Sequence, residues 1–162
     1  MKLLVFNIFL LTVAAVFGQT FYPKHRVIKK YHLMTLAPVN WFRALHHCRF
    51  LGMNLASITS LEENNQIIQQ IKIEGHERKH FWLSGTKLGF NDGYHWMGNG
   101  KTLTFTNWGG LQPDNLPNED CLQIWNVGDG PIDDSMWNDR NCSHDLYFIC
   151  EEEKIEYEYC SS

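Results

Sequence analysis

The sequence predicts an α+β fold, with two helices followed by a region of short antiparallel strands. Two segments before Gly75 have the apolar spacing of amphipathic helices. After Gly75 the apolar residues come in short aromatic or β-branched runs, separated by clusters of Gly, Asn, Asp and Pro. Because the helices precede the strands instead of alternating with them, repeated βαβ units are not expected.

The first predicted helix starts after Asn40, a residue type that favours the N-cap position. Its apolar residues recur at steps of three and four along one face, at Trp41, Ala44, Leu45, Cys48 and Leu51. Gly52 is a typical residue for the C-terminal stop.

The second predicted helix begins with a capping box, in which Ser60 is followed three residues later by Glu63. One side of this helix carries Leu61, Asn64, Ile67, Ile68 and Ile71. Gly75 marks the expected end of the helix.

Five strands are predicted after Gly75, at residues 81–83, 94–96, 103–105, 122–125 and 147–150. Turn-forming residues between them predict loops, chiefly at 89–93, 98–100, 109–118 and 128–134. We expect one domain over residues 31–152, preceded by a lead-in at 19–30 and followed by an acidic tail at 153–162.

The N-terminal segment has the pattern of a secretory signal peptide. Lys2 precedes an apolar stretch from Leu3 to Phe17, and small Gly18 follows. This stretch is too short for the roughly 20 residues of a membrane span. We therefore predict cleavage after Gly18 and a secreted, extracellular protein without membrane insertion.

The charge balance is slightly acidic, with 14 basic and 18 acidic residues and a formal net charge of −4. This balance argues against nucleic acid as a partner. Five glutamates between Glu151 and Glu158 supply much of the negative charge, and we interpret this segment as a solvated tail.

Secretion makes disulfides the expected state of the five cysteines. Four of them, Cys48, Cys121, Cys142 and Cys150, fall within the predicted domain. The fifth, Cys160, lies beyond the acidic segment, where an exposed thiol could join two chains. We therefore hypothesise that Cys160 forms a disulfide-linked homodimer.

The densest polar cluster runs from Gln112 to Cys121, and a second polar group follows at Trp137-Asn138-Asp139. Both offer carboxylate and amide oxygens and contain no histidine. Calcium takes six to eight oxygen ligands, whereas zinc prefers nitrogen or sulfur. The two groups therefore indicate Ca²⁺ as the cofactor, and Pro113 is a candidate for a cis peptide bond.

The combined pattern resembles the C-type lectin family over nearly the whole mature chain. The residues that carry this resemblance are Cys48, the stretch from Leu51-Gly52 to Leu55-Ala56, Phe81-Trp82-Leu83-Ser84-Gly85, Gln112-Pro113-Asp114, Glu119-Asp120-Cys121, Trp137-Asn138-Asp139, Cys142 and Cys150. The resemblance implies a C-type lectin-like fold, in which two helices flank short antiparallel sheets and a long loop binds calcium.

The resemblance also implies a sugar site built on the calcium ion. Its five calcium ligands match Gln112, Asp114, Glu119, Asn138 and Asp139, and the same side chains would hydrogen-bond the sugar hydroxyls. In the family a Gln-Pro-Asp tripeptide accompanies galactose-type sugars, which makes galactose-type glycans the expected partner. Exchanging an amide and an acid across the tripeptide reverses donors and acceptors, which selects a different hydroxyl geometry.

Two features depart from the family pattern. Strong galactose binders usually place a Trp just after the tripeptide, where this chain has Leu116. Thr86, Lys87 and Leu88 occupy the stretch in which some relatives carry an acidic ligand of an auxiliary calcium site. We therefore predict one functional calcium site.

Two disulfides are expected, Cys121 with Cys142 and Cys48 with Cys150. The first would draw the Glu119 segment toward the Trp137-Asn138-Asp139 segment, so that both halves of the ligand set converge. The second would tie the first helix to the last strand. Asn141 begins a formal glycosylation sequon, with Cys142 in its middle position.

Two alternatives compete with a galactose-type lectin. A C-type lectin-like module could instead bind protein or a non-galactose glycan. A zinc hydrolase could use His76-Glu77-Arg78-Lys79-His80, which has the spacing of a metalloprotease motif. That motif requires a helix, and here Gly75 precedes it and a strand-like run follows. We therefore predict no enzymatic activity.

Overall fold

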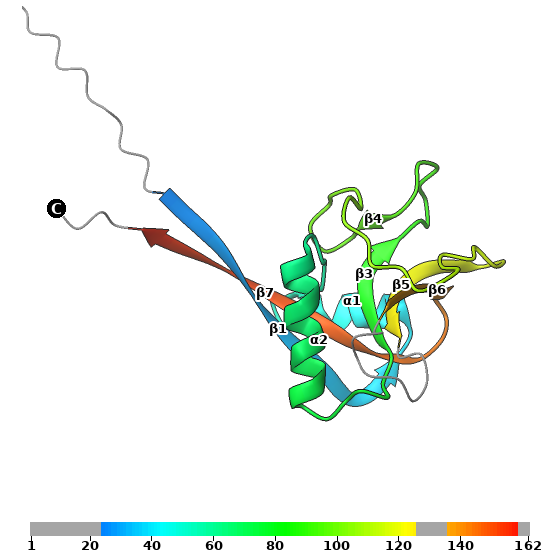
Figure 1. Ribbon diagram of the computed structural model, residues 1–162, viewed down its shortest axis with the longest axis horizontal. Helices are drawn as coiled ribbons and strands as arrows, with labels where there is room; N and C mark the ends of the chain where they lie inside the picture. Colours follow the sequence, from blue (N-terminus) through cyan, green and yellow to red (C-terminus); the bar gives the residue numbers. More distant parts are fainter. Residues whose placement is uncertain (1–23, 126–135, 159–162) are drawn as a thin grey trace, which may run out of the picture.

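The computed structural model describes residues 24–125 and 136–158, which form two helices and a mixed β-sheet (Figure 1). The predicted signal peptide, the turn-rich stretch at 128–134 and Cys160 lie outside the described residues. Within the described ranges, no helix is long and apolar enough to cross a membrane. The α+β prediction is confirmed.

The described strands form one sheet in the order β1-β7-β3-β5-β6. Their bounds are β1 (Lys24–Val39), β3 (Phe81–Thr86), β5 (Glu119–Trp125), β6 (Met136–Asn141) and β7 (Leu146–Glu158). Short β2 (Asn54–Leu55) pairs with β7, and short β4 (His95–Trp96) pairs with β3. The sequence predicted antiparallel strands only. The neighbours β3 and β7 run parallel, so the sheet is mixed.

The strand predictions were right for four of the five apolar runs, which correspond to β3, β4, β5 and β7. The run at 103–105 is not a strand. Leu103 and Phe105 instead pack as partly buried side chains against the main core. Their alternation reflects side-chain packing from an irregular segment, which has the same sequence pattern as a half-buried strand.

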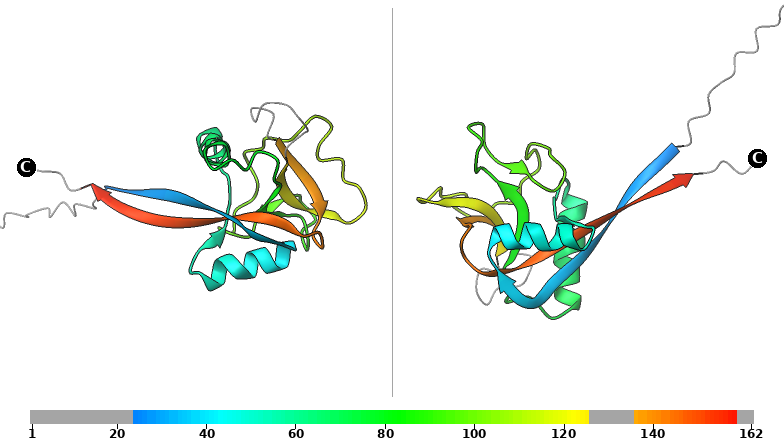
Figure 2. Two further views of the ribbon diagram at one scale, coloured as in Figure 1. Left: turned by 90° about the horizontal axis from the view of Figure 1, so that it is seen from below. Right: turned by 180° about the vertical axis from the view of Figure 1, so that it is seen from behind.

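The two helices have the predicted starts. In α1 (Trp41–Phe50) the Asn40 Oδ1 accepts a hydrogen bond from the Arg43 N–H at 3.0 Å. In α2 (Leu61–Ile73) the Ser60 Oγ accepts one from the Glu63 N–H at 3.2 Å. The helices lie on opposite sides of the β1/β7 ribbon (Figure 2).

The distal part of the β1/β7 ribbon contains the first residues of the predicted acidic tail, and residues 153–157 are exposed as expected of a solvated segment. Residues 153–158 continue β7 and pair in register with residues 24–29 of β1. The exposed Arg26 Nη2 and Glu156 Oε2 lie 3.3 Å apart across this ribbon. Such a surface pair contributes only about 0–1 kcal/mol. The backbone ladder is therefore the main link between these two strands.

Three buried tryptophans link separate elements of the core, and each indole N–H has an acceptor. Trp41 donates to the Leu83 carbonyl oxygen at 2.8 Å, and Trp82 donates to the Val39 carbonyl oxygen at 3.0 Å. Trp137 donates to the Asn64 Oδ1 at 3.0 Å, which joins α2 to β6. Trp82 and Trp137 are both fully buried.

Two disulfides join the expected pairs. Cys48 of α1 is bonded to Cys150 of β7, and the closed loop of about 100 residues contributes roughly 4–5 kcal/mol in the chain-entropy model. Cys121 of β5 is bonded to Cys142, just after β6, and contributes about 3 kcal/mol. The second bridge closes the hairpin that carries part of the polar cluster.

A buried ion pair ties β1 to β7 beside α2. The Glu151 side chain is fully buried, and its Oε2 lies 3.3 Å from the Lys29 Nζ. The same ammonium lies 3.1 Å from Glu63 Oε1 and donates to the Ser57 carbonyl oxygen at 2.7 Å. Burial raises the pKa of Glu151, and the positive charge of Lys29 opposes that shift.

Replacing Lys29 should therefore be costly. Lys29→Met leaves the buried Glu151 carboxylate without its cation and should lower the free energy of unfolding by about 3–5 kcal/mol at neutral pH. The loss should shrink on acidification, because protonation of Glu151 removes the buried charge. Urea unfolding measures both effects, with exposed Lys30→Met as the control. Equal losses in the two variants would contradict the assignment.

Candidate metal centre

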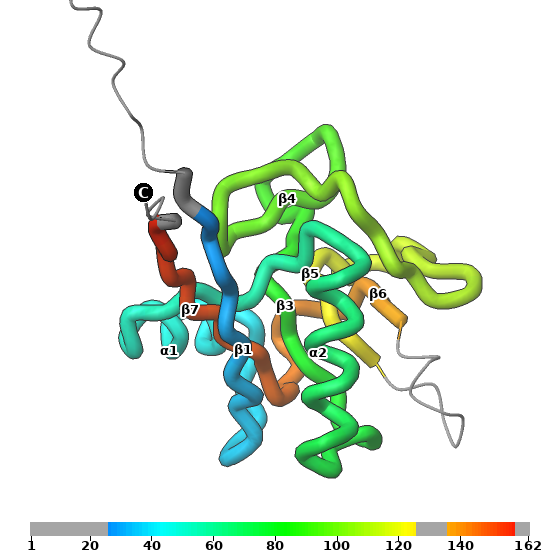
Figure 3. The backbone as a smooth tube through the Cα atoms, turned by 60° about the vertical axis from the view of Figure 1, so that its left-hand side comes forward, coloured from blue at the N-terminus to red at the C-terminus, as the bar shows by residue number. Residues whose placement is uncertain are grey.

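A long irregular stretch between β4 and β5 carries the first half of the polar cluster (Figure 3). Its Gln112-Pro113 peptide bond is cis, in agreement with the sequence prediction for Pro113. Asn115 and Asn118 adopt positive φ angles of 53° and 68°, a conformation that Asn tolerates better than most residues. The stretch therefore has a defined backbone path into β5.

Gln112 and Asp114 are held against each other across Pro113. The Gln112 Nε2 donates to Asp114 Oδ2 at 3.3 Å, and the Asp114 N–H donates to Gln112 Oε1 at 3.1 Å. The other carboxylate oxygen of Asp114 accepts the Leu116 N–H at 3.2 Å. Both side chains are thus oriented by contacts within the loop.

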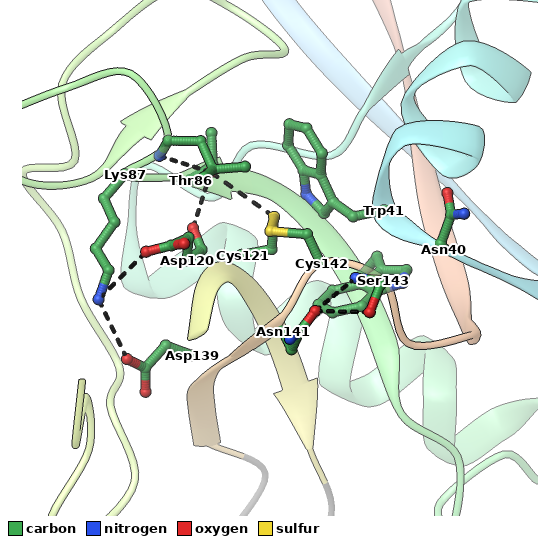
Figure 4. Close-up of a disulfide and its surroundings, with 12 residues drawn as sticks. Asn40, Trp41, Thr86, Lys87, Asp120, Cys121, Asp139, Asn141, Cys142 and Ser143 are labelled. Carbon is green, nitrogen blue, oxygen red and sulfur yellow. Dashed lines mark hydrogen bonds and ion pairs between the residues drawn. A yellow bond between two sulfur atoms is a disulfide. The ribbon is translucent and has the colours of Figure 1, made fainter. Parts of the chain in front are cut away.

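The β5/β6 hairpin supplies the second half of the cluster. Its register places Glu119 opposite Asn141, Leu122 opposite Asp139 and Gln123 opposite Asn138. The Cys121–Cys142 disulfide lies beside this hairpin (Figure 4).

Asp139 connects the hairpin to the long loop. Its Oδ2 accepts the Asn115 N–H at 3.1 Å and the Tyr94 hydroxyl at 3.2 Å. The Asp139 side chain is fully buried, so these contacts are shielded from water. The loop and the sheet are therefore fixed relative to each other at this carboxylate.

Three carboxylates from the two halves meet in one place. Asp114, Glu119 and Asp139 each offer an oxygen, and these oxygens all lie within 4.8 Å of one another. Asp139 is buried, Glu119 is partly buried and Asp114 is exposed. The group is therefore open to solvent on one side and closed on the other.

Two buried oxygens lack hydrogen-bond partners among the described residues: Oδ1 of Asp139, a member of this group, and Oδ1 of Asn138, its neighbour in sequence. The two residues are 0% and 4% exposed. A buried polar atom without a partner costs about 1–3 kcal/mol, so such atoms call for an explanation. Hard oxygen donors of this kind fit calcium.

The electrostatics of the group favour a cation. Partial burial raises the pKa of Glu119, and the negative charges of Asp114 and Asp139 raise it further. Burial and the Asp139 charge raise the pKa of Tyr94 in the same way, so its phenol stays protonated and can donate to Asp139. A bound cation would remove the repulsion that destabilises ionised Glu119.

Four of the five sequence-predicted ligands lie within one group of contacts, and the fifth, Asn138, adjoins the group in sequence. Gln112, Asp114, Glu119 and Asp139 are linked by the contacts above, and Asn138 precedes Asp139 on β6 with an unpaired oxygen. Sequence reasoning missed Tyr94 and Asn115, which hold Asp139 from elements far away in the chain. From the sequence, Lys87 stood out only as a non-acidic residue in the stretch where some relatives carry an acidic calcium ligand.

The segment His76–His80, which has the spacing of a zinc-protease motif, does not form a zinc-protease site. Helix α2 ends at Ile73, and residues 74–80 form turns and irregular backbone. The two histidines therefore do not lie one helical turn apart on a helix, as the motif requires. The His80 pKa is lowered by burial and by the nearby positive charge of Arg140.

Comparisons with known proteins show similarity to C-type lectins. Residues 37–152 match the family described as "Lectin C-type domain". The chain is 30% identical over 128 residues to the C-type lectin mosGCTL-7 of Aedes aegypti, covering 76% of this chain and 83% of that protein. It is 36% identical over 102 residues to the alpha-N-acetylgalactosamine-specific lectin of Patiria pectinifera, covering 60% and 56%.

Further similarity extends to a longer protein and to solved structures. The chain is 28% identical to lectin subunit alpha of Sarcophaga peregrina, with 76% of this chain covered but only 44% of that protein. The carbohydrate-recognition domain of the mouse scavenger receptor C-type lectin superposes with a TM-score of 0.63 at 29% identity, covering 78% and 89% of the two chains. The calcium-free form of a Ca²⁺-dependent type II antifreeze protein gives 0.65 at 30%, covering 76% and 91%.

Neutralising Glu119 should have opposite effects with and without calcium. In chelator, Glu119→Gln relieves the repulsion among the three carboxylates and should raise the unfolding temperature by about 2 °C. In calcium at 100 times the dissociation constant, the parent should gain about 2.7 kcal/mol, and the variant should gain little. Calorimetric scans measure both, with exposed Asp145→Asn as control. A calcium shift preserved in Glu119→Gln would contradict the ligand role.

Proposed function

This chain belongs to the C-type lectin family, and from that premise we propose that it is a secreted, calcium-dependent lectin for galactose-type glycans. The main support is the meeting of three carboxylates from two separate segments, together with the unpartnered buried oxygens of Asp139 and of Asn138, which precedes it on β6. Fold and family describe a recognition protein rather than an enzyme. Its activity would consist of binding alone.

In this proposal, Gln112, Asp114, Glu119, Asn138 and Asp139 hold the calcium ion. The bound ion would supply open coordination positions for two neighbouring sugar hydroxyls. The ligating side chains would hydrogen-bond the same hydroxyls, with the carboxylates accepting and the amides donating. Contacts around Asp139 would keep the set in place before the ion arrives, which lowers the entropic cost of binding.

The galactose preference is supported by the order of Gln112 and Asp114 across the cis Gln112-Pro113 bond. The named specificity of the Patiria pectinifera lectin points to the same sugar class. No aromatic ring follows the tripeptide, because Leu116 stands there and is 55% exposed. Its side chain can cover the apolar face of a sugar, but without the aromatic contact, so we expect weak binding at a single site.

Secretion is supported by the N-terminal signal pattern and by the two disulfides, which form and persist in oxidising compartments. We further propose that Cys160 links two chains. Because weak single sites gain avidity when they are joined, such a dimer would bind multivalent glycans far more tightly than the monomer.

Galactose affinity chromatography tests the proposed function. The parent should be retained on galactose resin in calcium and released by chelator, and free galactose should compete about tenfold better than mannose. Glu119→Ala and Asn138→Ala should flow through in calcium. Asn65→Ala, which removes an exposed amide from α2, should be retained like the parent.

The same experiment separates the alternative of a module that binds protein or another glycan. Retention that persists in chelator, or no retention at all, would contradict the galactose proposal. A glycan array with and without calcium would then identify whether a different sugar class is bound.

The dimer hypothesis makes a simple prediction about mass. Under non-reducing electrophoresis the mature parent should run at twice its reduced mass, and Cys160→Ser should run as a monomer in both conditions. The variant should keep its affinity for monovalent galactose but lose avidity on a multivalent surface. A parent mass that reductant leaves unchanged would contradict the hypothesis.

A further inference from the structure

We propose that Lys87 is a built-in counter-cation of the candidate metal centre, which holds the long loop to the sheet without calcium and weakens calcium binding. The first part stands on the contacts of Lys87 alone. The second part rests on the proposed calcium function. The two parts have different readouts and can fail separately.

The Lys87 ammonium lies between the carboxylates of Asp120 and Asp139 (Figure 4), and it also contacts the Asn115 side chain. Its Nζ donates to Asn115 Oδ1 at 2.8 Å and lies 3.7 Å from Asp139 Oδ2 and 3.8 Å from Asp120 Oδ1. Asn115 belongs to the long loop, Asp120 to β5 and Asp139 to β6. Since Lys87 directly follows β3, one cation connects four separate segments.

The position of Lys87 is set by its surroundings. Its backbone N–H donates to the Asp120 carbonyl oxygen at 3.0 Å, and the preceding Thr86 hydroxyl donates to that oxygen at 2.8 Å. Its Nζ lies 5.4 Å from the centre of the Tyr94 ring. The side chain is only 23% exposed. Lys87 is therefore a fixed internal cation and not a mobile surface lysine.

Asp139 couples this cation to the metal centre. Its Oδ2 faces Lys87, Tyr94 and Asn115, and its Oδ1 has no partner among the described residues. Asp139 also belongs to the carboxylate group with Asp114 and Glu119. The ammonium therefore lies within a few ångströms of that group, well inside the Debye length of about 8–10 Å at physiological salt.

Two effects of this charge have opposite signs. Without calcium, one positive charge among the carboxylates of Asp114, Glu119, Asp120 and Asp139 reduces their mutual repulsion and stabilises the loop. With calcium, the same charge repels the incoming divalent cation. At an effective dielectric constant between that of a protein surface and that of water, and with screening by physiological salt, the repulsion weakens calcium binding by roughly 3- to 30-fold.

A purely structural lysine would behave differently. If Lys87 only packed the loop in place, its removal would disorder the ligands and weaken calcium binding. Tyr94 and Asn115 continue to hold Asp139 when Lys87 is gone, because both donate to it directly. The charge effect should therefore dominate, and removal should strengthen calcium binding.

The test compares Lys87→Met and Lys87→Arg with the parent, using the full mature chain and calcium chloride as the only ligand. In chelator, Lys87→Met should unfold about 3 °C or more below the parent, and Lys87→Arg should stay close to it. The deficit of Lys87→Met should shrink in about 1 M salt, which screens carboxylate repulsion. Titration calorimetry should then give a calcium dissociation constant roughly 3- to 30-fold lower for Lys87→Met. Exposed Lys101→Met is the matched control and should change neither quantity.

The outcomes separate this inference from the proposed function. Lys87→Met that is as stable as the parent in chelator, or a deficit that salt does not reduce, would overturn the counter-cation role. Calcium binding to Lys87→Met that is equal to or weaker than that of the parent would overturn the effect on affinity. A parent that takes up no calcium would refute the proposed function, and the chelator measurements would still decide the first part. Lys87→Gln replaces Lys87→Met if the latter does not fold.

Discussion

The arrangement of the site depends on one buried carboxylate, that of Asp139. It belongs to β6, yet its Oδ2 receives the Asn115 N–H from the long loop and the Tyr94 hydroxyl from the residue just before β4. A loop with few buried side chains has little apolar surface to fix its position. Hydrogen bonds to an ionised acceptor contribute more than neutral ones, about 1.5–3 kcal/mol each. The loop is therefore located by charge-assisted contacts to the sheet.

The buried carboxylates of Glu151 and Asp139 have contrasting surroundings. Glu151 faces Lys29 at 3.3 Å and accepts the Ser57 N–H at 3.0 Å, and its side chain is fully buried. Asp139 faces Lys87 at the longer distance of 3.7 Å, and the exposed Asp114 lies on the same cluster. The shorter Lys29–Glu151 pair stabilises the fold. The longer Lys87–Asp139 pair lies beside a solvent-exposed carboxylate group, so negative charge remains there for a further cation.

The parts of the fold that were predictable from sequence are those with local causes. Asn40 and Ser60 mark helix starts because an N-cap side chain acts within three residues of itself. Strand β6 was missed, since its residues Met136–Asn141 are mostly polar and become a strand only by pairing with β5. The long β1 was missed because its partner β7 lies more than a hundred residues away.

The residues of the site divide in the same way, into those that the local sequence indicates and those that only the fold brings together. Gln112, Asp114 and Glu119 are close in sequence, and their residue types alone indicate an oxygen-rich site. Lys87, Tyr94 and Asn115 meet Asp139 only because β3, β4 and the loop are brought to the β5/β6 hairpin. A lysine 52 residues from its partner carboxylate gives no local pattern, so its role could be read only from the structure.

The balance of charges also explains how a binding loop can be ordered before it binds. Concentrated carboxylates repel one another, and a site that waits for a divalent cation must tolerate that repulsion in its absence. The Cys121–Cys142 disulfide restrains the hairpin covalently, and Lys87 offsets part of the charge. Both act on the side of Asp139 and leave Asp114 exposed. The disulfide and Lys87 thus order the site from its buried side. Its solvent-exposed side keeps the unbalanced negative charge that attracts a cation.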